Sequence, residues 1–329
     1  MIELNGHLVD FKMFPNGETF ADLPDKWLRN ENVFHLRFES DADLLHLMWL
    51  KNTVDARVGK VPSMLFCPYF PYSRMDRAEG TRQFTLKSIA NLINSLEFSS
   101  VWALEPHSDV LPALVNNFHP LSLSLFGKRT GLPLIAANDW MAHQGLCEDS
   151  RFSTFEGLTH DSTSGYDFSA FYDAGIYFVY PDAGAQKRYS KEYPYSKSIL
   201  CAKDRDFETG KIRGIIPVLT DEAINDCRCA IIVDDLCSGG RTFIEVAKAL
   251  RQRLPNLKSV ILCVPHCENT VALNIEEVEN TVDSIYTTDS IFYHDAEMKA
   301  KLSRPLFVVG KLVVPSVVNA FDGNVDIDF

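Results

Sequence analysis

The sequence predicts an α/β protein made of two tandem domains, each with a parallel sheet at its core. Apolar runs of strand length alternate with longer amphipathic stretches of helix length, which is the pattern of βαβ units. This alternation occurs twice, once before about residue 140 and again after about residue 170. The chain has 329 residues, and one domain usually holds about 100–200 residues. We therefore expect one domain over residues 1–140 and a second over residues 141–329.

The expected strands are short and rich in Val, Ile, Leu and Phe, as buried parallel strands are. They cover residues 33–37, 63–67, 101–104, 177–180, 230–233 and 260–264. The expected helices repeat apolar residues at intervals of three and four, and they cover residues 42–58, 85–96 and 243–254. Residues 138–169 are polar and rich in Ser, Thr, Gly and Asp, which predicts a long connection or insertion.

Composition and charge exclude several classes of function. The formal net charge is −12, from 32 Lys and Arg against 44 Asp and Glu, so the chain lacks the basic footprint of a nucleic-acid-binding protein. The same charge disfavours an anionic membrane surface as a partner. No apolar run approaches the ~18 residues of a membrane span, and the N-terminus lacks the pattern of a signal peptide. We expect a cytoplasmic protein with small anionic substrates bound by local cations and backbone N–H groups.

The eight cysteines favour buried thiols in a reducing compartment. Cys227 and Cys229 are too close together for a usual zinc site. Cys263, His266 and Cys267 lack a second pair of ligands. Structural thiols are therefore the preferred interpretation.

The strongest local signal is the segment 230–243, which reads Ala-Ile-Ile-Val-Asp-Asp-Leu-Cys-Ser-Gly-Gly-Arg-Thr-Phe. Four apolar residues predict a buried strand, and Asp234 and Asp235 follow at its carboxyl end. The glycines let backbone N–H groups turn toward one point, and the following helix adds its partial positive charge. Together they favour an anion site suited to a phosphate, with the carboxylates accepting from vicinal sugar hydroxyls. The alternative is that the aspartates cap the turn and the glycines only permit it.

The rest of the chain supplies matching parts, and through them it resembles the ribose-phosphate pyrophosphokinases (phosphoribosyl pyrophosphate synthetases). Six motifs follow in order: Phe14-Pro-Asn-Gly-Glu18, Pro68-Tyr-Phe-Pro-Tyr-Ser-Arg-Met-Asp-Arg77, Glu105-Pro-His107, Pro181-Asp-Ala-Gly184, Lys203-Asp-Arg205 and the loop from Asp234 to Thr242. The resemblance implies two tandem phosphoribosyltransferase-type α/β domains. It also implies transfer of the β,γ-diphosphoryl group of Mg-ATP to the anomeric hydroxyl of ribose 5-phosphate, with release of AMP. The same resemblance implies a homo-oligomer.

The resemblance assigns roles to individual residues. ATP would be bound by Phe14, Asn16, Glu18, Arg74, Asp76 and Arg77. The sugar and its phosphate would be bound by Asp182, Asp234, Asp235, Cys237, Ser238, Gly239, Gly240, Arg241 and Thr242. Mg²⁺ would be held by His107, Glu105 and Asp182, and the catalytic residues would be Lys203, Arg205 and His107. Residues 201–213 are charged and weakly periodic, which predicts a flexible loop that brings two cations to the diphosphoryl group.

Each assignment has a plainer alternative in the residues themselves. Arginines three positions apart, such as Arg74 and Arg77, are often only solvated, and a histidine at a strand end is often structural. Asp182 lies at a strand-to-helix turn, where it can cap the helix and bind a ligand at the same time. A charge run such as the one around Lys203 is usually solvated surface.

The chain departs from the family pattern at three places. Asn16 stands where the family usually has Asp, and Glu105 stands where the metal-linked motif has Asp. In the sugar-phosphate loop, Ser238 removes a carboxylate, Gly239 removes a hydroxyl and Arg241 adds a cation relative to an Asp-Thr-Gly-Gly-Thr type of loop. A loop with an added cation could accept a diphosphate. The acceptor is therefore either ribose 5-phosphate or ADP-ribose, the latter being the acceptor of a divergent phage branch of the family.

Two other functions compete with the diphosphokinase. A phosphoribosyltransferase shares the loop from Asp234 to Thr242 but needs neither the ATP-side motifs nor Lys203 and Arg205. A non-catalytic regulatory relative tends to lose the residues of the catalytic loop, whereas Lys203, Arg205, His107 and Asp182 are all present. The sequence thus favours an enzyme of the ribose-phosphate diphosphokinase type with Mg²⁺ and ATP.

Overall fold

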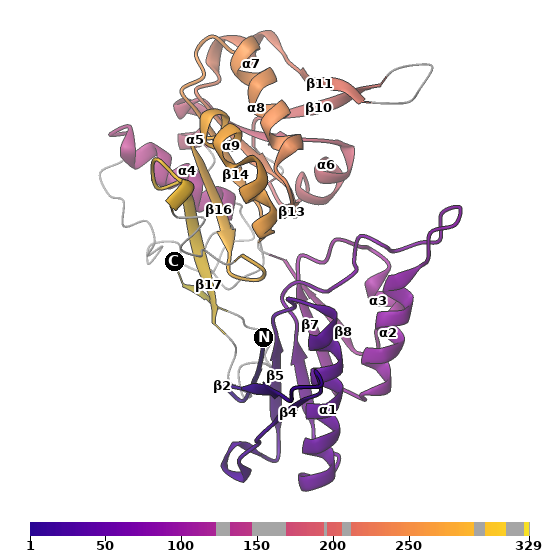
Figure 1. Ribbon diagram of the computed structural model, residues 1–329. Helices are drawn as coiled ribbons and strands as arrows, with labels where there is room; N and C mark the ends of the chain where they lie inside the picture. Colours follow the sequence, from indigo (N-terminus) through magenta and orange to yellow (C-terminus); the bar gives the residue numbers. More distant parts are fainter. Residues whose placement is uncertain are drawn as a thin grey trace. The chain divides into compact units, whose positions relative to one another are not determined.

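The fold is seen in a computed structural model, which describes residues 1–122, 132–146, 169–193, 196–205, 212–292, 300–313 and 326–328. For residues 169, 203–205, 212–213, 313 and 326–328 this description covers the backbone only. The chain divides into two compact units, one of Met1–Gly127 with Leu312–Asp328 and one of Lys128–Lys311. Figure 1 shows the elements of each unit.

The first unit contains a six-stranded sheet of order β2-β1-β5-β6-β7-β8. Its strands are β1 (Ile2–Leu4), β2 (His7–Leu8), β5 (Asn32–Leu36), β6 (Ser63–Phe66), β7 (Ser100–Leu104) and β8 (Phe118–Leu121). Strands β5 to β8 are parallel, whereas β1 pairs antiparallel with both β2 and β5. A separate hairpin pairs β3 (Phe11–Met13) with β4 (Thr19–Ala21), and a short 3-10 helix, η1, covers Asp25–Trp27.

Helices α1 (Asp41–Val58), α2 (Thr85–Ser95) and α3 (Leu111–Leu114) connect the parallel strands of this unit. A capping box of Ser40 and Asp43 starts α1, and Gly59 ends it with a positive φ of 80° and an extended ψ of −179°, a conformation that suits glycine. Leu47 and Val54 of α1 are fully buried against the sheet, each burial being worth about 1.5–3 kcal/mol. Leu44 and Val54, which helical spacing assigns to the apolar face, are buried, whereas Leu45 of the same apolar pattern is 48% exposed.

An eight-stranded sheet of order β11-β10-β9-β12-β14-β16-β17-β18 contains most of the strands of the second unit, and its last strand, β18, falls within the residues assigned to the first unit. Its strands are β9 (Ile176–Tyr180), β10 (Ser198–Arg205), β11 (Ile212–Val218), β12 (Cys229–Val233), β14 (Ser259–Cys263), β16 (Ser284–Thr288), β17 (Phe307–Val313) and β18 (Asp326–Asp328). The run from β10 through β9, β12, β14 and β16 to β17 is parallel, and β11 is antiparallel to β10. Two short strands, β13 (Leu236–Cys237) and β15 (His266–Cys267), pair in parallel outside this sheet.

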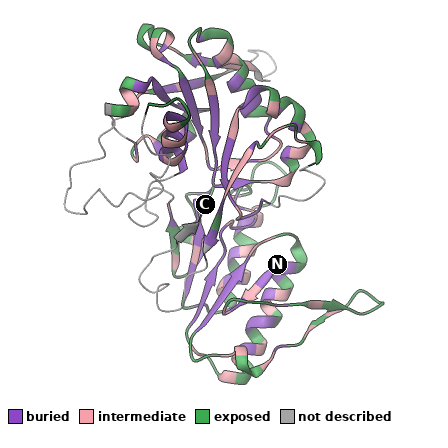
Figure 2. Ribbon diagram, turned by 90° about the vertical axis from the view of Figure 1, so that its left-hand side faces the viewer, coloured by how far each residue is buried: buried purple, intermediate pink, exposed green. Residues whose placement is uncertain are grey.

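Of the described helices of the second unit, two precede β9 in the sequence and the others lie between its strands. They are α4 (Leu132–His143), α5 (Ser169–Ala174), α6 (Ala183–Tyr189), α7 (Asp221–Asp226), α8 (Arg241–Arg253) and α9 (Ile275–Thr281), with a 3-10 helix, η2, at Asn269–Asn274. All five residues of β12 are buried, and α8 turns Phe243, Val246 and Leu250 into the same core. Figure 2 shows buried strands and helices whose outer faces are exposed.

The structure confirms the predicted α/β class with parallel-sheet cores, and each predicted strand and helix is present within one or two residues of its expected bounds. Two local predictions are wrong. Residues 138–143 are helical, because Ala137, Trp140 and Met141 supply α4 with a buried face. Lys203 and Arg205 lie on strand β10, opposite Ile215 and Ile212, rather than in a loop. The boundary expected after residue 140 falls inside α4, which belongs to the second unit.

The cysteines in the described part of the chain are buried, free thiols. Burial raises the pKa of Cys201 and of Cys227 to about 12, and a thiol in that state is a poor nucleophile and a poor metal ligand. No helix among the described residues is long and apolar enough to cross a bilayer.

Candidate active site

The sugar-phosphate residues of the second unit lie at the carboxyl ends of two neighbouring strands. Asp182 follows β9, Asp234 follows β12, and these strands are parallel partners in the sheet. After β9 the chain moves to β10 on one side, whereas β12 and β14 follow on the other side. The order of the strands therefore reverses between β9 and β12, which is the position where open α/β sheets bind their ligands.

The loop from Asp234 to Gly240 leads directly into α8. Gly240 is the N-cap of this helix, with φ of 77° and ψ of −7°, a left-handed conformation that suits glycine. No side chain in the described part of the chain caps the helix, so its first backbone N–H groups remain available for an anion. Arg241 and Thr242 are exposed in the first turn. The predicted anion site is thus present as a glycine turn at the N-terminus of a 13-residue helix.

Three carboxylates meet at this edge of the sheet. Asp182 caps α6 by accepting hydrogen bonds from the backbone N–H groups of Gly184 at 2.9 Å and Ala185 at 3.1 Å. Asp235 is buried, and its Oδ2 lies 3.5 Å from Nη1 of Arg188 on α6. Burial, the charge of Asp235 and that of Asp182 raise the pKa of Asp234 well above its usual value. Negative charge therefore exceeds positive charge here, as it would at a site completed by a cation or a polyhydroxylated ligand.

A second segment holds the glycine turn in place. Ser238 Oγ donates to Oε2 of Glu268 at 2.6 Å, and Asn274 Nδ2 donates to the carbonyl of Gly239 at 2.6 Å. Strands β13 and β15 pair the loop with this segment, with Cys237 opposite Cys267. The Ser238 side chain and the Gly239 backbone carbonyl therefore contact the segment 268–274, which lies about 30 positions later in the chain.

In the first unit, the motif from Phe14 to Glu18, predicted to bind ATP, forms the turn of the β3–β4 hairpin. Phe14 is half-exposed and stacks on Phe20, with 4.6 Å between the ring centroids. Asn16 donates from Nδ2 to Glu18 Oε2 at 2.8 Å and accepts from the backbone N–H of Glu18 at 3.1 Å, while Gly17 has a φ of 89°. Asn16 thus builds the turn, and an exposed aromatic face remains at its tip.

The segment 68–77, predicted to bind ATP, and the Glu-Pro-His motif at 105–107 lie together at the carboxyl edge of the first sheet. The segment 68–77 follows β6, and Glu105 follows its parallel partner β7. Ser108 Oγ donates to Oδ2 of Asp76 at 2.9 Å, which ties the two segments to each other. Asp76 therefore has a structural role, because it holds the two segments together, whereas Arg74 and Arg77 are exposed at this edge.

The three predicted metal ligands have different environments. Glu105 is buried in a left-handed conformation with φ of 37°, and it accepts a hydrogen bond from Ser122 Oγ at 2.8 Å. His107 is exposed two residues later. Among the described residues, no three His, Cys, Asp or Glu side chains converge closely enough to hold a metal ion without help. Each of the two carboxylates, Glu105 and Asp182, would suit a Mg²⁺ ion that takes most of its ligands from phosphate and water, since Mg²⁺ is often held through one or two carboxylates only.

The predicted catalytic residues Lys203 and Arg205 lie near the end of β10, where the β10–β11 pair has an irregular register between Asp204 and Arg205. Residues 206–211, which connect the two strands, and the side chains of residues 203–205 lie outside the description. Of the aromatic residues in the predicted insertion 138–169, Phe152 and Phe155 also lie outside the described residues, and Trp140 is buried in α4.

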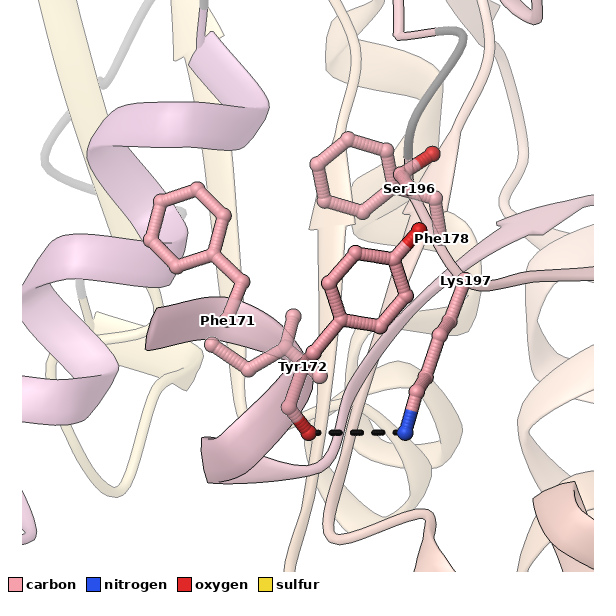
Figure 3. A pocket seen from close by; sticks show the side chains of 6 residues that line it. Phe171, Tyr172, Phe178, Ser196 and Lys197 are labelled. Atoms are coloured by element: carbon pink, nitrogen blue, oxygen red, sulfur yellow. Dashed lines mark hydrogen bonds between the residues drawn. The ribbon is translucent and has the colours of Figure 1, made fainter. Parts of the chain in front are cut away.

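A small pocket in the second unit contains none of the predicted site residues (Figure 3). Its lining includes Phe171, Tyr172, Phe178 and Lys197, and Lys197 Nζ is 3.5 Å from the carbonyl oxygen of Tyr172. The same ammonium group donates to Asp226 Oδ2 at 2.6 Å. Lys197 is therefore a structural cation that joins α7 to the strand region.

Comparisons with known proteins agree with this arrangement. Over 303 residues the chain is 23% identical to a ribose-phosphate pyrophosphokinase of Thermosipho africanus, which covers 90% of this chain and 78% of the relative. It is 20% identical over 317 residues to a ribose-phosphate pyrophosphokinase of Thermotoga maritima, covering 94% and 88% of the two chains. A search of family models finds no match.

Among solved structures, phosphoribosylpyrophosphate synthetase from Mycobacterium smegmatis is similar, with a TM-score of 0.65 and 14% identity. The match covers 96% of this chain and 91% of that one. The relatives confirm the predicted resemblance to the ribose-phosphate pyrophosphokinases, and the solved structure confirms the fold. The relatives' names also confirm the predicted enzyme class, a diphosphotransferase.

Sequence reasoning missed three residues of this region. Arg188 faces Asp235, while Glu268 and Asn274 hold the glycine turn. Arg188 lies six residues after Asp182, a spacing that does not place two residues on the same face of a helix, so the sequence carries no local signal for this contact. Glu268 and Asn274 have none either, because the pairing of β13 with β15 that brings them to the loop joins distant parts of the chain.

Proposed function

We propose that the chain is a diphosphokinase that transfers the β,γ-diphosphoryl group of Mg-ATP to the anomeric hydroxyl of a 5-phosphorylated ribose and releases AMP. One observation carries the proposal: Asp182, Asp234 and Asp235 stand beside an uncapped helix N-terminus at the strand-order reversal of the second sheet. A sugar hydroxyl is a good donor to a carboxylate, and a phosphate is a good acceptor for backbone N–H groups. The two halves of this region therefore match the two halves of a sugar phosphate.

The roles of the residues follow from this placement. Asp234 and Asp235 accept hydrogen bonds from the ribose hydroxyls, and Arg188 limits the repulsion between the carboxylates by pairing with Asp235. The turn at Gly239 and Gly240 binds the 5-phosphoryl group through backbone N–H groups. On the ATP side, the exposed face of Phe14 suits a purine, and Arg74 and Arg77 suit a polyphosphate.

Charge is the main requirement of the reaction, since diphosphoryl transfer places dispersed negative charge on the transferred group. Lys203 and Arg205 supply positive charge from β10, and Mg²⁺, held by His107, Glu105 or Asp182 together with phosphate oxygens, would neutralise the rest. No general base is needed if the C1 hydroxyl is held in line with the β-phosphorus, because positioning alone contributes much of the rate. A homo-oligomer and a cytoplasmic location belong to the same proposal.

For the acceptor we propose ADP-ribose ahead of ribose 5-phosphate. Gly239 has no side chain where the family has Thr, and Asn274 Nδ2 lies 3.3 Å from the position that a Cβ would take there. Arg241 follows the turn as an exposed cation, and it makes no ion pair within the described part of the chain. The second phosphoryl group of ADP-ribose would give this guanidinium a partner, which ribose 5-phosphate lacks. A charged hydrogen bond left unmade costs roughly 1.5–3 kcal/mol, so ribose 5-phosphate should react at least about tenfold less efficiently.

The test is a turnover mixture of the protein, Mg-ATP and one acceptor, followed by phosphorus NMR. AMP and a new C1 diphosphate ester should form together. ADP as the sole nucleotide product would show an ordinary kinase and end the proposal. Competition between equal concentrations of the two acceptors then gives the ratio of kcat/KM. If ribose 5-phosphate wins, or if Arg241→Ala affects both acceptors alike, the preference for ADP-ribose is wrong.

A further inference from the structure

The glycine turn has a carboxylate beside it that comes from a distant part of the chain. Ser238 Oγ donates to Oε2 of Glu268 at 2.6 Å, and Thr270 Oγ1 donates to the same oxygen at 3.0 Å. The backbone N–H of Glu268 donates to the carbonyl of Cys237 at 2.7 Å. The side chain of Glu268 therefore binds Ser238 and its backbone binds Cys237, the two residues that precede the glycines of the loop.

The geometry decides what Ser238 can offer to a ligand. A hydroxyl has a single proton to donate, and here that proton points to a carboxylate. Its oxygen can then accept a hydrogen bond from a sugar hydroxyl, but it cannot donate one to a phosphate oxygen. Phosphate binding is left to the backbone N–H groups of the turn and to Arg241.

We propose that Glu268 is a positioning residue of the acceptor site, acting with Ser238 as one unit. Ser238 stands where the loop of the ribose-phosphate pyrophosphokinases has a carboxylate. Glu268 supplies a carboxylate next to this position, because its Oε2 lies 2.6 Å from Ser238 Oγ. The pair keeps the loop acidic on its sugar side while leaving the amides of the turn to the phosphate. This inference rests on the proposed function, because it assigns a role toward the same acceptor.

The test exchanges the carboxylate between the two positions. Glu268→Gln removes the charge, and the KM for the acceptor should rise about tenfold while the KM for ATP changes less than twofold. Ser238→Asp alone places two carboxylates in contact, so the acceptor KM should rise and should fall again toward pH 6, relative to the wild type at each pH. The double variant Ser238→Asp/Glu268→Gln has one carboxylate again, and its acceptor KM should return to within about threefold of the wild type.

Glu276→Gln is the matched control, because Glu276 is an exposed carboxylate on α9 that should leave both KM values unchanged. A structural role for Glu268 alone would make the two substitutions additive, so a double variant worse than either single variant overturns the inference. An acceptor KM within twofold of the wild type in Glu268→Gln overturns it as well. If the wild-type protein diphosphorylates neither acceptor, the proposed function itself has failed. If the wild-type enzyme is active but the double variant does not regain the wild-type acceptor KM, only the role of Glu268 is refuted.

Discussion

Replacing Gly240 by alanine tests whether the turn before α8 is set by backbone conformation. Gly240 has a φ of 77°, and a Cβ atom added there would lie 3.0 Å from Cγ2 of Val278. A left-handed conformation costs an alanine roughly 1–2 kcal/mol. The reduced entropy of the unfolded chain offsets about 0.4–1 kcal/mol of this, and the close contact with Val278 adds to the cost. We expect Gly240→Ala to lower the free energy of unfolding by about 1–2 kcal/mol.

Gly239→Ala is the control at the adjacent position. Gly239 lies outside the left-handed region, and its added Cβ would meet only Asn274 Nδ2, at 3.3 Å. That atom must shift by a few tenths of an ångström while it keeps its hydrogen bond to the Gly239 carbonyl, so the free energy of unfolding should fall by less than about 1 kcal/mol. Urea titrations give both values, and each kcal/mol corresponds to about 2–4 °C in Tm for a unit of this size. Equal stability of Gly240→Ala and the wild type would refute the conformational argument.

Three further predictions concern Tyr286, Asp234 and the predicted catalytic residue Lys203, all in the second unit. Tyr286→Phe removes the 2.8 Å hydrogen bond from Tyr286 Oη to Asp139 Oδ2, which joins β16 to α4, and should cost roughly 1.5–3 kcal/mol in a urea titration. Asp234→Asn should raise Tm at pH 7, with a difference that shrinks toward pH 4. Because the pKa of Asp234 is raised in the folded chain, the folded chain keeps this proton at pH values above about 3.8, where the unfolded chain loses it. The contribution of Asp234 to the free energy of unfolding therefore falls as the pH rises above about 3.8. Thermal melts of both proteins across this range would contradict the prediction if the difference were constant or reversed. Lys203→Ala should lower kcat at least about 100-fold in steady-state assays with a much smaller effect on the KM for ATP, and a near-normal kcat would remove Lys203 from the catalytic residues.

The fold was predictable because its signals are local. The apolar run before Asp234 and the spacing of Phe243, Val246 and Leu250 each specify one element, and the structure places β12 and α8 there. Alternation of such elements then implies parallel sheets. Residues 201–205 misled the prediction, since charged residues on an edge pair of strands have no apolar period, although β10 pairs with β11 over this stretch.

The candidate site was predictable only where a motif is continuous in sequence. Asp182, Asp234 and the glycine turn belong to such motifs, and the structure brings their strands together as neighbours. Glu268 and Arg188 reach the same region through the pairing of β13 with β15 and through α6, respectively. Contacts of this kind depend on tertiary structure, so no spacing within the sequence announces them.

The most direct measurement of the central claim follows the β-phosphorus of ATP. The protein is incubated with Mg²⁺, ATP labelled with ³²P at the β position, and either ribose 5-phosphate or ADP-ribose. The account predicts that the label moves to the acceptor, in equal amount to the AMP formed, and that the transfer requires both the divalent ion and an acceptor with a free C1 hydroxyl. Label that stays in ADP, or AMP that forms with free diphosphate whether or not an acceptor is present, would contradict diphosphoryl transfer.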